Sequence, residues 1–205
     1  MTRSRPELKV TVFSDYICPF CYVGDARLNH LRTDYDLKVN WCFLEIHPET
    51  SPAGEPVASL DYPSETWQRM MATLREMAEE ENLSLLDHGF TTNSQSALLL
   101  AEAAKYVDRD VFYHLHNRLF EAYFSEGQNI GERDCLCRLA LDAGMNAEQI
   151  EAAWQDGAVA TRLQHYQKAA HDLGVKATPT YFIGEQRLDG AVPVEQLVQA
   201  AKAFR

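Results

Sequence analysis

The sequence has no apolar run long enough to cross a bilayer, which takes about 20 consecutive apolar residues. Its first seven residues, Met-Thr-Arg-Ser-Arg-Pro-Glu, lack the apolar segment of a secretory signal. Lys and Arg form no long basic run, and the net charge is −11. Nucleic acids and anionic membranes are bound through basic surfaces, so we expect neither as a partner. These absences predict a cytoplasmic protein.

Cysteine is scarce as well, with five residues at positions 18, 21, 42, 135 and 137. An odd number without a signal peptide is not typical of a disulfide framework. A zinc site needs four ligands, and Cys135 and Cys137 would point about 200° apart on a helix, so no metal is expected. We expect Cys42, Cys135 and Cys137 to pack as small apolar side chains. The remaining pair, Cys18 and Cys21, has the CxxC spacing of a redox motif.

The residues around this pair predict where it lies in the fold. Val10 to Phe13 are β-branched or aromatic and predict a strand, and a helix follows the CxxC motif. Pro19 suits the first position of that helix, which makes Cys18 its N-cap and places Cys21 in its first turn. Free N–H groups and the helix dipole would then lower the pKa of Cys18. Cys18 is therefore the expected attacking sulfur, and Cys21 the resolving one.

Along the chain, elements of α/β type flank a long helical block. Strands are predicted over 8–14, 37–44 and 180–183, with a return strand from 187. Helices are predicted over 18–33, 64–81, 94–107, 112–123, 132–143, 147–155, 158–173 and 194–204, with Ser64 and Ser94 as N-caps. Residues 1–7 read as a tail, and the Pro-rich stretch 47–63 as an irregular connection. We expect residues 1–63 and 174–205 to form one α/β domain, interrupted by a helical insertion over 64–173.

Several strings resemble one known family. They are Ser-Asp-Tyr-Ile-Cys-Pro-Phe-Cys-Tyr-Val-Gly24, Leu119 to Gly127, Gly174 to Gly184 with its Thr-Pro step, and Asp189-Gly-Ala191. Together with the element order, they resemble the DsbA-like branch of the thioredoxin fold, and more narrowly its FrnE-type members. The resemblance implies a thioredoxin fold interrupted by an all-helical domain. It also implies a thiol–disulfide oxidoreductase that acts on protein or small-molecule thiols and disulfides.

The resemblance also implies roles for individual residues. Cys18 and Cys21 match the redox pair, and Pro179 matches a cis-proline that lies opposite the two cysteines. The backbone of Thr178, where many relatives have Val, would then pair with an extended substrate. Pro19 and Phe20 would tune the pair, and Phe20 stands where the periplasmic oxidants have His, which implies a less oxidising couple. No cofactor is implied beyond the two thiols, with glutathione as a candidate redox partner.

Two other functions fit the same scaffold. The hydroxychromene carboxylate isomerases and the kappa-class glutathione transferases resemble it but carry Ser where Cys18 stands. A glutathione-dependent isomerase or transferase that acts on a small aromatic molecule is therefore the alternative, and it needs Cys18 but not Cys21. A binding module or chaperone would need neither cysteine. A homodimer is the commonest assembly of such chains and is kept as an expectation.

Three further features have a plain structural interpretation. Asp15 precedes the CxxC motif and is expected to cap the turn rather than relay protons. His47 is expected to face solvent from a loop rather than to line the active site. The methionines at positions 70, 71 and 77 repeat at helical spacing and are expected in the core.

Overall fold

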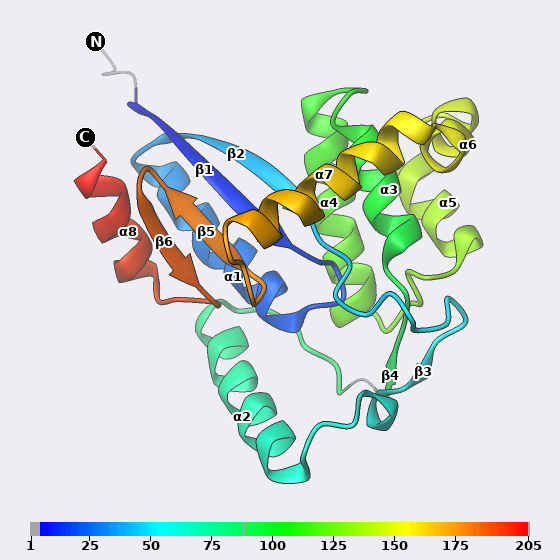
Figure 1. The fold of residues 1–205 in the computed structure, drawn as a ribbon, viewed down its shortest axis with the longest axis horizontal. Helices are drawn as coiled ribbons and strands as arrows, with labels where there is room; N and C mark the ends of the chain where they lie inside the picture. Colours follow the sequence, from blue (N-terminus) through cyan, green and yellow to red (C-terminus); the bar gives the residue numbers. More distant parts are fainter. Residues whose placement is uncertain (1–4, 88, 205) are drawn as a thin grey trace.

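Four strands form the central sheet, in the order β2-β1-β5-β6 (Figure 1). In this computed structural model, which describes residues 5–87 and 89–204, they are β1 (Glu7–Ser14), β2 (Asp36–Phe43), β5 (Thr180–Ile183) and β6 (Gln186–Asp189). β1 and β2 run parallel, β5 is antiparallel to β1, and β6 returns beside β5 in a hairpin. The strand–helix–strand unit and the hairpin are confirmed. The first four residues of the predicted tail over 1–7 lie outside the described part of the chain.

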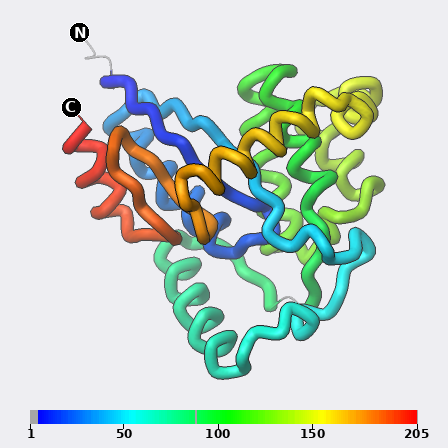
Figure 2. The backbone as a smooth tube through the Cα atoms, in the orientation of Figure 1, coloured from blue at the N-terminus to red at the C-terminus, as the bar shows by residue number. Residues whose placement is uncertain are grey.

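Helices cover both faces of this sheet. Apolar side chains alternate along β1, where Leu8, Val10 and Val12 join the main core together with Leu28 of α1 (Pro19–Asn29) and Leu197 of α8 (Val194–Ala203). On the other face, a small cluster of Phe13, Cys42 and Ala170 attaches α7 (Gly157–Asp172) to the sheet. The tube in Figure 2 shows α7 crossing in front of the strands while α1 lies behind them.

The helical block packs on the sheet through aromatic rings. Besides α7, it contains α3 (Gln95–Ala104), α4 (Arg109–Phe124), α5 (Arg133–Ala143) and α6 (Ala147–Gln155). Tyr16, just after β1, lies 4.9 Å from Phe120 of α4 between ring centroids, and Phe43 at the end of β2 lies 6.5 Å from Phe112. One continuous hydrophobic core therefore runs from the sheet into the helices. None of the helices in the described residues has the length and apolar character needed to cross a membrane.

Helix α2 (Ser64–Glu80) lies apart from the other helices of the insertion and packs chiefly on α1 (Figure 1). Leu74 and Ala78 of α2 are buried against Val23 of α1. The connection that precedes α2, predicted to be irregular, contains β3 (Glu55–Pro56) and the 3₁₀ helix η2 (Val57–Leu60), and β3 pairs with β4 (Phe90–Thr91). The division into domains at residues 63 and 173 stays a prediction.

Several helix ends differ from their predictions, each for a local reason. The helix predicted over 18–33 ends at Asn29 and continues as the 3₁₀ helix η1 (His30–Thr33). The helix predicted from residue 112 begins at Arg109, because the Asp108 carboxylate accepts hydrogen bonds from the first-turn N–H groups. The N-cap of α2 is Pro63 and not Ser64, since the Pro63 carbonyl already accepts the first helical hydrogen bond, from Trp67.

A buried ion-pair cluster attaches α2 to the sheet domain. The Arg27 side chain of α1 is 4% exposed and bonds the Glu81 carboxylate, which is 8% exposed, at 3.2 Å. Arg27 also pairs with Glu80 and donates to the Ala191 carbonyl at 2.7 Å. Removing the guanidinium would take away the buried cation that faces Glu81 and leave this carboxylate with the more exposed His30 ring, at 2.8 Å.

We therefore expect Arg27→Ala to lower the free energy of unfolding by about 3 kcal/mol, because breaking a buried pair from one side strands the other charge. Urea denaturation of the variant measures this loss. Arg75→Ala is the matched control, because Arg75 of α2 pairs with Asp87 at an exposed position and its loss should cost less than about 1 kcal/mol. Equal losses in the two variants would contradict the prediction.

Candidate active site

The CxxC motif lies at the start of α1, as predicted. Cys18 is the N-cap, Pro19 is the first helical residue, and the Cys21 N–H donates to the Cys18 carbonyl at 2.9 Å. The turn between β1 and α1 is closed by the Cys18 N–H, which donates to the Asp15 carbonyl at 3.3 Å. This local geometry follows from the sequence, because proline at the second position of the motif suits only a helix start.

The two thiols are unequal. Both cysteines are free and buried. A hydrogen bond from the Cys21 thiol is the largest cause that lowers the pKa of Cys18, while burial raises the pKa of Cys21. The predicted direction for Cys18 is correct, but the helix start is not its main cause, because the backbone N–H of Cys21 contributes less than the Cys21 thiol. Cys18 is thus the sulfur that becomes a thiolate more easily.

A segment 160 residues further along the chain completes the site. The Thr178–Pro179 peptide bond is cis, as the resemblance implied. The Cys18 Sγ donates to the Thr178 carbonyl oxygen at 3.4 Å, and a hydrogen bond with the Thr178 side chain contributes to lowering the pKa of Cys18. Phe20, the other residue of the motif, is half-buried and packs against both the main core and the α2 cluster.

The start of α1 lies close to the Thr178–Pro179 segment, and two residues at this contact were not predicted from the sequence. A Cβ at Gly24 would lie 2.9 Å from the Pro179 ring and would overlap the Tyr181 hydroxyl. Tyr181, on β5, is fully buried, and its hydroxyl has no hydrogen-bond partner within the described structure. The available signal was a glycine in the interior of a helix, which costs about 1 kcal/mol relative to alanine and therefore indicates a packing requirement.

Asp15 also has a larger role than predicted. Its carboxylate is completely buried and accepts hydrogen bonds from the Ile46 N–H at 2.9 Å, the Ser94 hydroxyl at 3.0 Å and the Ile17 N–H at 3.3 Å. Only the bond to Ile17 is the predicted turn cap. The others join the turn to the segment after β2 and to α3, so the Ser94 hydroxyl serves Asp15 rather than the helix. Burial raises the pKa of Asp15 to about 7, and its charge raises the pKa of Cys18.

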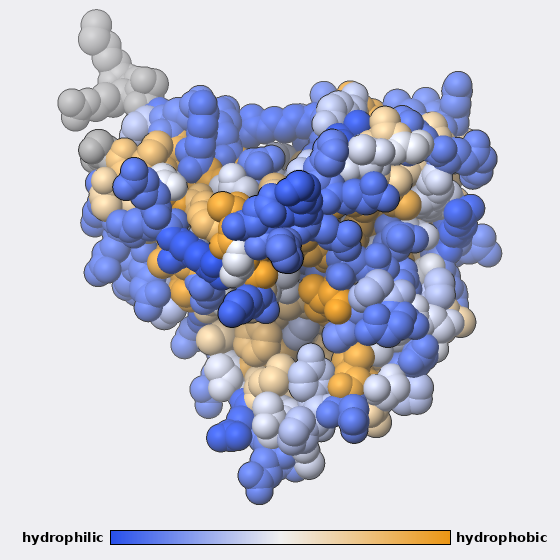
Figure 3. All heavy atoms as spheres, viewed as in Figure 1, coloured by the Kyte–Doolittle hydropathy of each residue, from blue (hydrophilic) through white to orange (hydrophobic). Residues whose placement is uncertain are grey.

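A mostly apolar cleft opens beside Cys18. Its volume is about 410 Å³, within the range of small-ligand sites. The space-filling view shows hydrophobic residues gathered between α2 and the β3–β4 ribbon (Figure 3). The walls come from the active-site turn, η2, α2 and the cis-proline loop, and the lining residues include Ile17, Cys18, Phe20, Ile46, His47, Leu60, Tyr62, Trp67, Met70, Met71, Phe90, Lys176 and Thr178.

Two interpretations from the sequence are wrong here. His47 is half-buried and lines this cleft instead of facing solvent, and burial lowers its pKa. Met70 forms part of the cleft wall and is not a core residue. Met71 and Met77 are half-buried and pack against the small core cluster of α1 and α2, as expected, and Met71 lines the cleft as well. The cleft exists because of the position of α2. Helical periodicity indicates which face of a helix is apolar, but it does not indicate which part of the protein that face contacts.

The other cysteines lie away from this site. Cys42 is buried in β2, and burial raises its pKa to about 11. Cys135 is buried in α5, and Cys137 is half-buried against the main core. Their packing as small side chains is confirmed. Across the described ranges, no cluster of three or more His, Cys, Asp or Glu side chains is arranged to hold a metal ion.

Fold and site together define a thioredoxin-fold protein with a dithiol at a helix start, opposite a cis-proline. The sequence profile of the DsbA-like thioredoxin domain matches residues 9–202. The chain belongs to this family, and its fold is the DsbA-like fold expected from the sequence.

Individual relatives are similar over nearly the whole chain. YwbO of Bacillus subtilis, an uncharacterised protein, is 29% identical over 189 residues, covering 89% of this chain and 90% of that protein. The probable DsbA oxidoreductase SCO1869 of Streptomyces coelicolor is 24% identical with a TM-score of 0.84, and the match covers 97% of this chain and 90% of that one.

Two further similar structures belong to proteins with different activities. The cytosolic disulfide reductase DsbM of Pseudomonas aeruginosa, solved with GSH, has a TM-score of 0.67 at 18% identity, covering 96% of this chain and 95% of that one. A 2-hydroxychromene-2-carboxylate isomerase has a TM-score of 0.72 at 20% identity, covering 96% and 94%. At these identities, the likeness shows the fold.

Gly24→Ala is expected to lower the free energy of unfolding by about 1–3 kcal/mol, because the added methyl group overpacks the contact with Pro179 and Tyr181. Gly157→Ala, with nothing near its added Cβ, is the matched control and should be neutral or slightly stabilising. Thermal unfolding of both variants compares them. A Gly24→Ala protein as stable as Gly157→Ala would show that α1 does not pack tightly against Pro179 and Tyr181.

For Asp15→Asn we expect the thiolate titration of Cys18, followed by absorbance at 240 nm, to move to lower pH, because a negative charge that opposes the thiolate is removed. The folded state also holds the Asp15 proton more tightly than the unfolded chain, so this group stabilises the wild type most below about pH 4. That contribution is lost as pH rises from about 4 to about 7. The free energy of unfolding of Asp15→Asn should therefore not show this decrease.

Asp34→Asn, at an exposed position, is the control with the same change of charge. It should leave both the Cys18 titration and the pH dependence of stability as they are in the wild type. If Asp15→Asn and Asp34→Asn give the same Cys18 titration, the buried carboxylate does not act on Cys18.

Proposed function

We propose that the protein is a thiol–disulfide oxidoreductase of the FrnE type, which exchanges disulfides with its substrates through Cys18 and Cys21. The observation that carries the proposal is the unequal pair of thiols at a helix start, next to the cis Thr178–Pro179 bond. A structural pair of cysteines has no need of a lowered pKa at one sulfur, nor of a cleft that leads to it.

In the reducing direction, the Cys18 thiolate attacks one sulfur of a substrate disulfide, and the other substrate sulfur leaves as a thiolate. Cys21 then loses its proton and attacks the Cys18 sulfur, which releases the second substrate thiolate. Two electrons have passed to the substrate, and the protein holds a Cys18–Cys21 disulfide. In the oxidising direction the same steps run in reverse. The high pKa of Cys21 keeps it protonated until the mixed disulfide forms.

The partner that restores the pair is proposed to be glutathione, in a cytosolic setting. The similar structure of DsbM is that of a cytosolic disulfide reductase with GSH, and it has the same fold. No cofactor beyond the two thiols is proposed. Phe20 gives Cys18 no hydrogen-bonding cation, so the couple should be less oxidising than one with His at this position.

The cleft supports a substrate with an apolar segment next to its sulfur. Trp67, Met70 and Met71 of α2 present apolar surface within the same cavity as Cys18. Methionine side chains adapt to different partners, which suits an exchange protein with several substrates. Thr178 and Pro179 are proposed to align the substrate backbone beside the sulfur, and Lys176 supplies a cation on the same loop.

The alternative is a glutathione-dependent isomerase or transferase acting on a small aromatic molecule. The specific observation in its favour is the aromatic lining of the cleft, to which Tyr62, Trp67 and Phe90 contribute. In that reaction Cys18 would activate glutathione, and no internal disulfide would form. The requirement for Cys21 therefore distinguishes the two functions.

Cys18→Ser is expected to abolish disulfide exchange, and Cys21→Ser to trap a mixed disulfide at Cys18, because the resolving sulfur is absent. Equilibration in glutathione buffers, followed by thiol alkylation and mass measurement, shows both. The wild type should titrate as one two-electron couple, and Cys42→Ser, which lies outside the site, should titrate in the same way. A wild-type pair that stays reduced throughout, or full activity in Cys21→Ser with an aromatic substrate, would favour the isomerase.

A further inference from the structure

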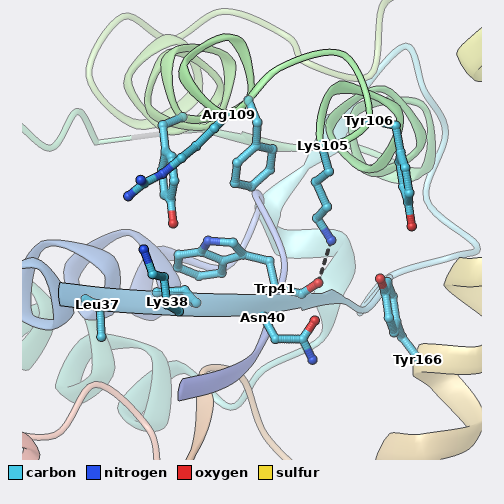
Figure 4. Close-up of a pocket in the computed structure, with 11 residues that line it drawn as sticks. Leu37, Lys38, Asn40, Trp41, Lys105, Tyr106, Arg109 and Tyr166 are labelled. Carbon is cyan, nitrogen blue, oxygen red and sulfur yellow. Dashed lines mark hydrogen bonds between the residues drawn. The ribbon is translucent and has the colours of Figure 1, made fainter. Parts of the chain in front are cut away.

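A second pocket lies at the outer edge of β2, away from Cys18 (Figure 4). Its volume is about 410 Å³, and it is enclosed by β2, by the junction of α3 and α4, and by Tyr166 of α7. Each described residue that lines it is different from those that line the Cys18 cleft. The exchange reaction proposed above makes no use of this pocket.

The pocket gathers positive charge on a chain whose net charge is −11. Lys38, Lys105 and Arg109 all line it, and Figure 4 shows the charged ends of Lys38 and Arg109 pointing into the same space beside the Trp41 ring. Within the described residues Arg109 makes no ion pair, and its guanidinium lies 5.8 Å from the Tyr113 ring centroid.

Lys38 and Lys105 both form ion pairs already, but these pairs differ in how easily a ligand could replace the carboxylate. Lys38 pairs with Asp36 at 2.9 Å, but both side chains are more than 40% exposed, so exchanging this partner costs little. Lys105 is committed, because it pairs with the buried Glu102 and donates to the Trp41 carbonyl at 2.6 Å. Lys38 and Arg109 are thus the two cations available to an anion.

Aromatic rings supply the rest of the lining. Trp41 is almost fully buried, and its indole N–H has no acceptor in the described structure. Tyr106, at the rim, is 68% exposed, and the Arg162 guanidinium lies over its ring, 4.3 Å from the centroid.

An added β-strand is disfavoured as the occupant, although β2 is an edge strand. The Leu37 carbonyl accepts from Arg32 at 3.4 Å, and the Trp41 carbonyl accepts from Lys105. Side chains that occupy the backbone acceptors of an edge strand protect it from pairing. The pocket volume of about 410 Å³ instead suits a small molecule.

We propose that this pocket binds a small planar aromatic anion, such as an aryl carboxylate or aryl phosphate. Lys38 and Arg109 hold the anionic group, and the ring packs among Trp41, Tyr106 and Tyr113. The site is separate from the dithiol, so binding does not depend on the redox state of Cys18 and Cys21.

Calorimetric titration of the full chain with 2-naphthoate tests this inference, with 2-naphthalenemethanol as the uncharged match. We expect one site for the anion and weaker binding of the alcohol. Arg109→Gln and Lys38→Gln should each weaken the anion by about three- to tenfold, the usual effect of losing one charge-assisted hydrogen bond. Arg138→Gln, an exposed cation on α5 outside the pocket, is the control and should bind as the wild type does.

Met71→Glu distinguishes the two cavities, because it places a negative charge in the Cys18 cleft and leaves the second pocket unchanged. Binding of 2-naphthoate to this variant should equal that of the wild type. Absence of binding at millimolar probe, equal affinity in the Arg109, Lys38 and Arg138 variants, or loss of binding only in Met71→Glu would each overturn the proposal. None of these outcomes bears on disulfide exchange, which is measured independently.

Discussion

The close approach of α1 to the cis-proline loop is the contact on which the candidate site depends. Gly24 lets the helix lie against Pro179 and Tyr181, and this position brings Cys18 to 3.4 Å from the Thr178 carbonyl. A side chain at position 24 would push apart two segments that the chain brings together from its two ends. Because protein interiors are close-packed, such a shift would be transmitted to the sulfur.

Asp15 links this contact to the rest of the protein. The buried carboxylate holds the turn before Cys18, the segment after β2 and the start of α3 through three hydrogen bonds. Burial raises the pKa of this carboxyl group to about 7, although the three hydrogen bonds act in the opposite direction. The same group therefore stabilises the junction of sheet and helices and sets part of the electrostatic environment of the redox pair.

The position of α2 determines what reaches the sulfur. Arg27 and Glu81 fix its end, Leu74 is buried against α1, and the same side of the helix presents Met70 and Met71 to the cleft. A helix that follows the connection after β2 thus builds a wall of the cleft beside Cys18. The second pocket arises in a comparable way, where the α3–α4 junction meets the free edge of β2.

Much of this could be predicted from the sequence, because the deciding interactions are local. Alternation along Glu7–Ser14, proline after Cys18 and the spacing of the helices specify elements, and the N-cap position of Cys18 follows from Pro19 alone. Only the tertiary structure decided what those elements contact. The burial of Asp15, the place of His47 in the cleft and the cations beside Trp41 depend on residues far apart in the chain. Periodicity indicates which face of an element is buried but carries no information about the surface that covers it, and that surface determines pKa values and pockets.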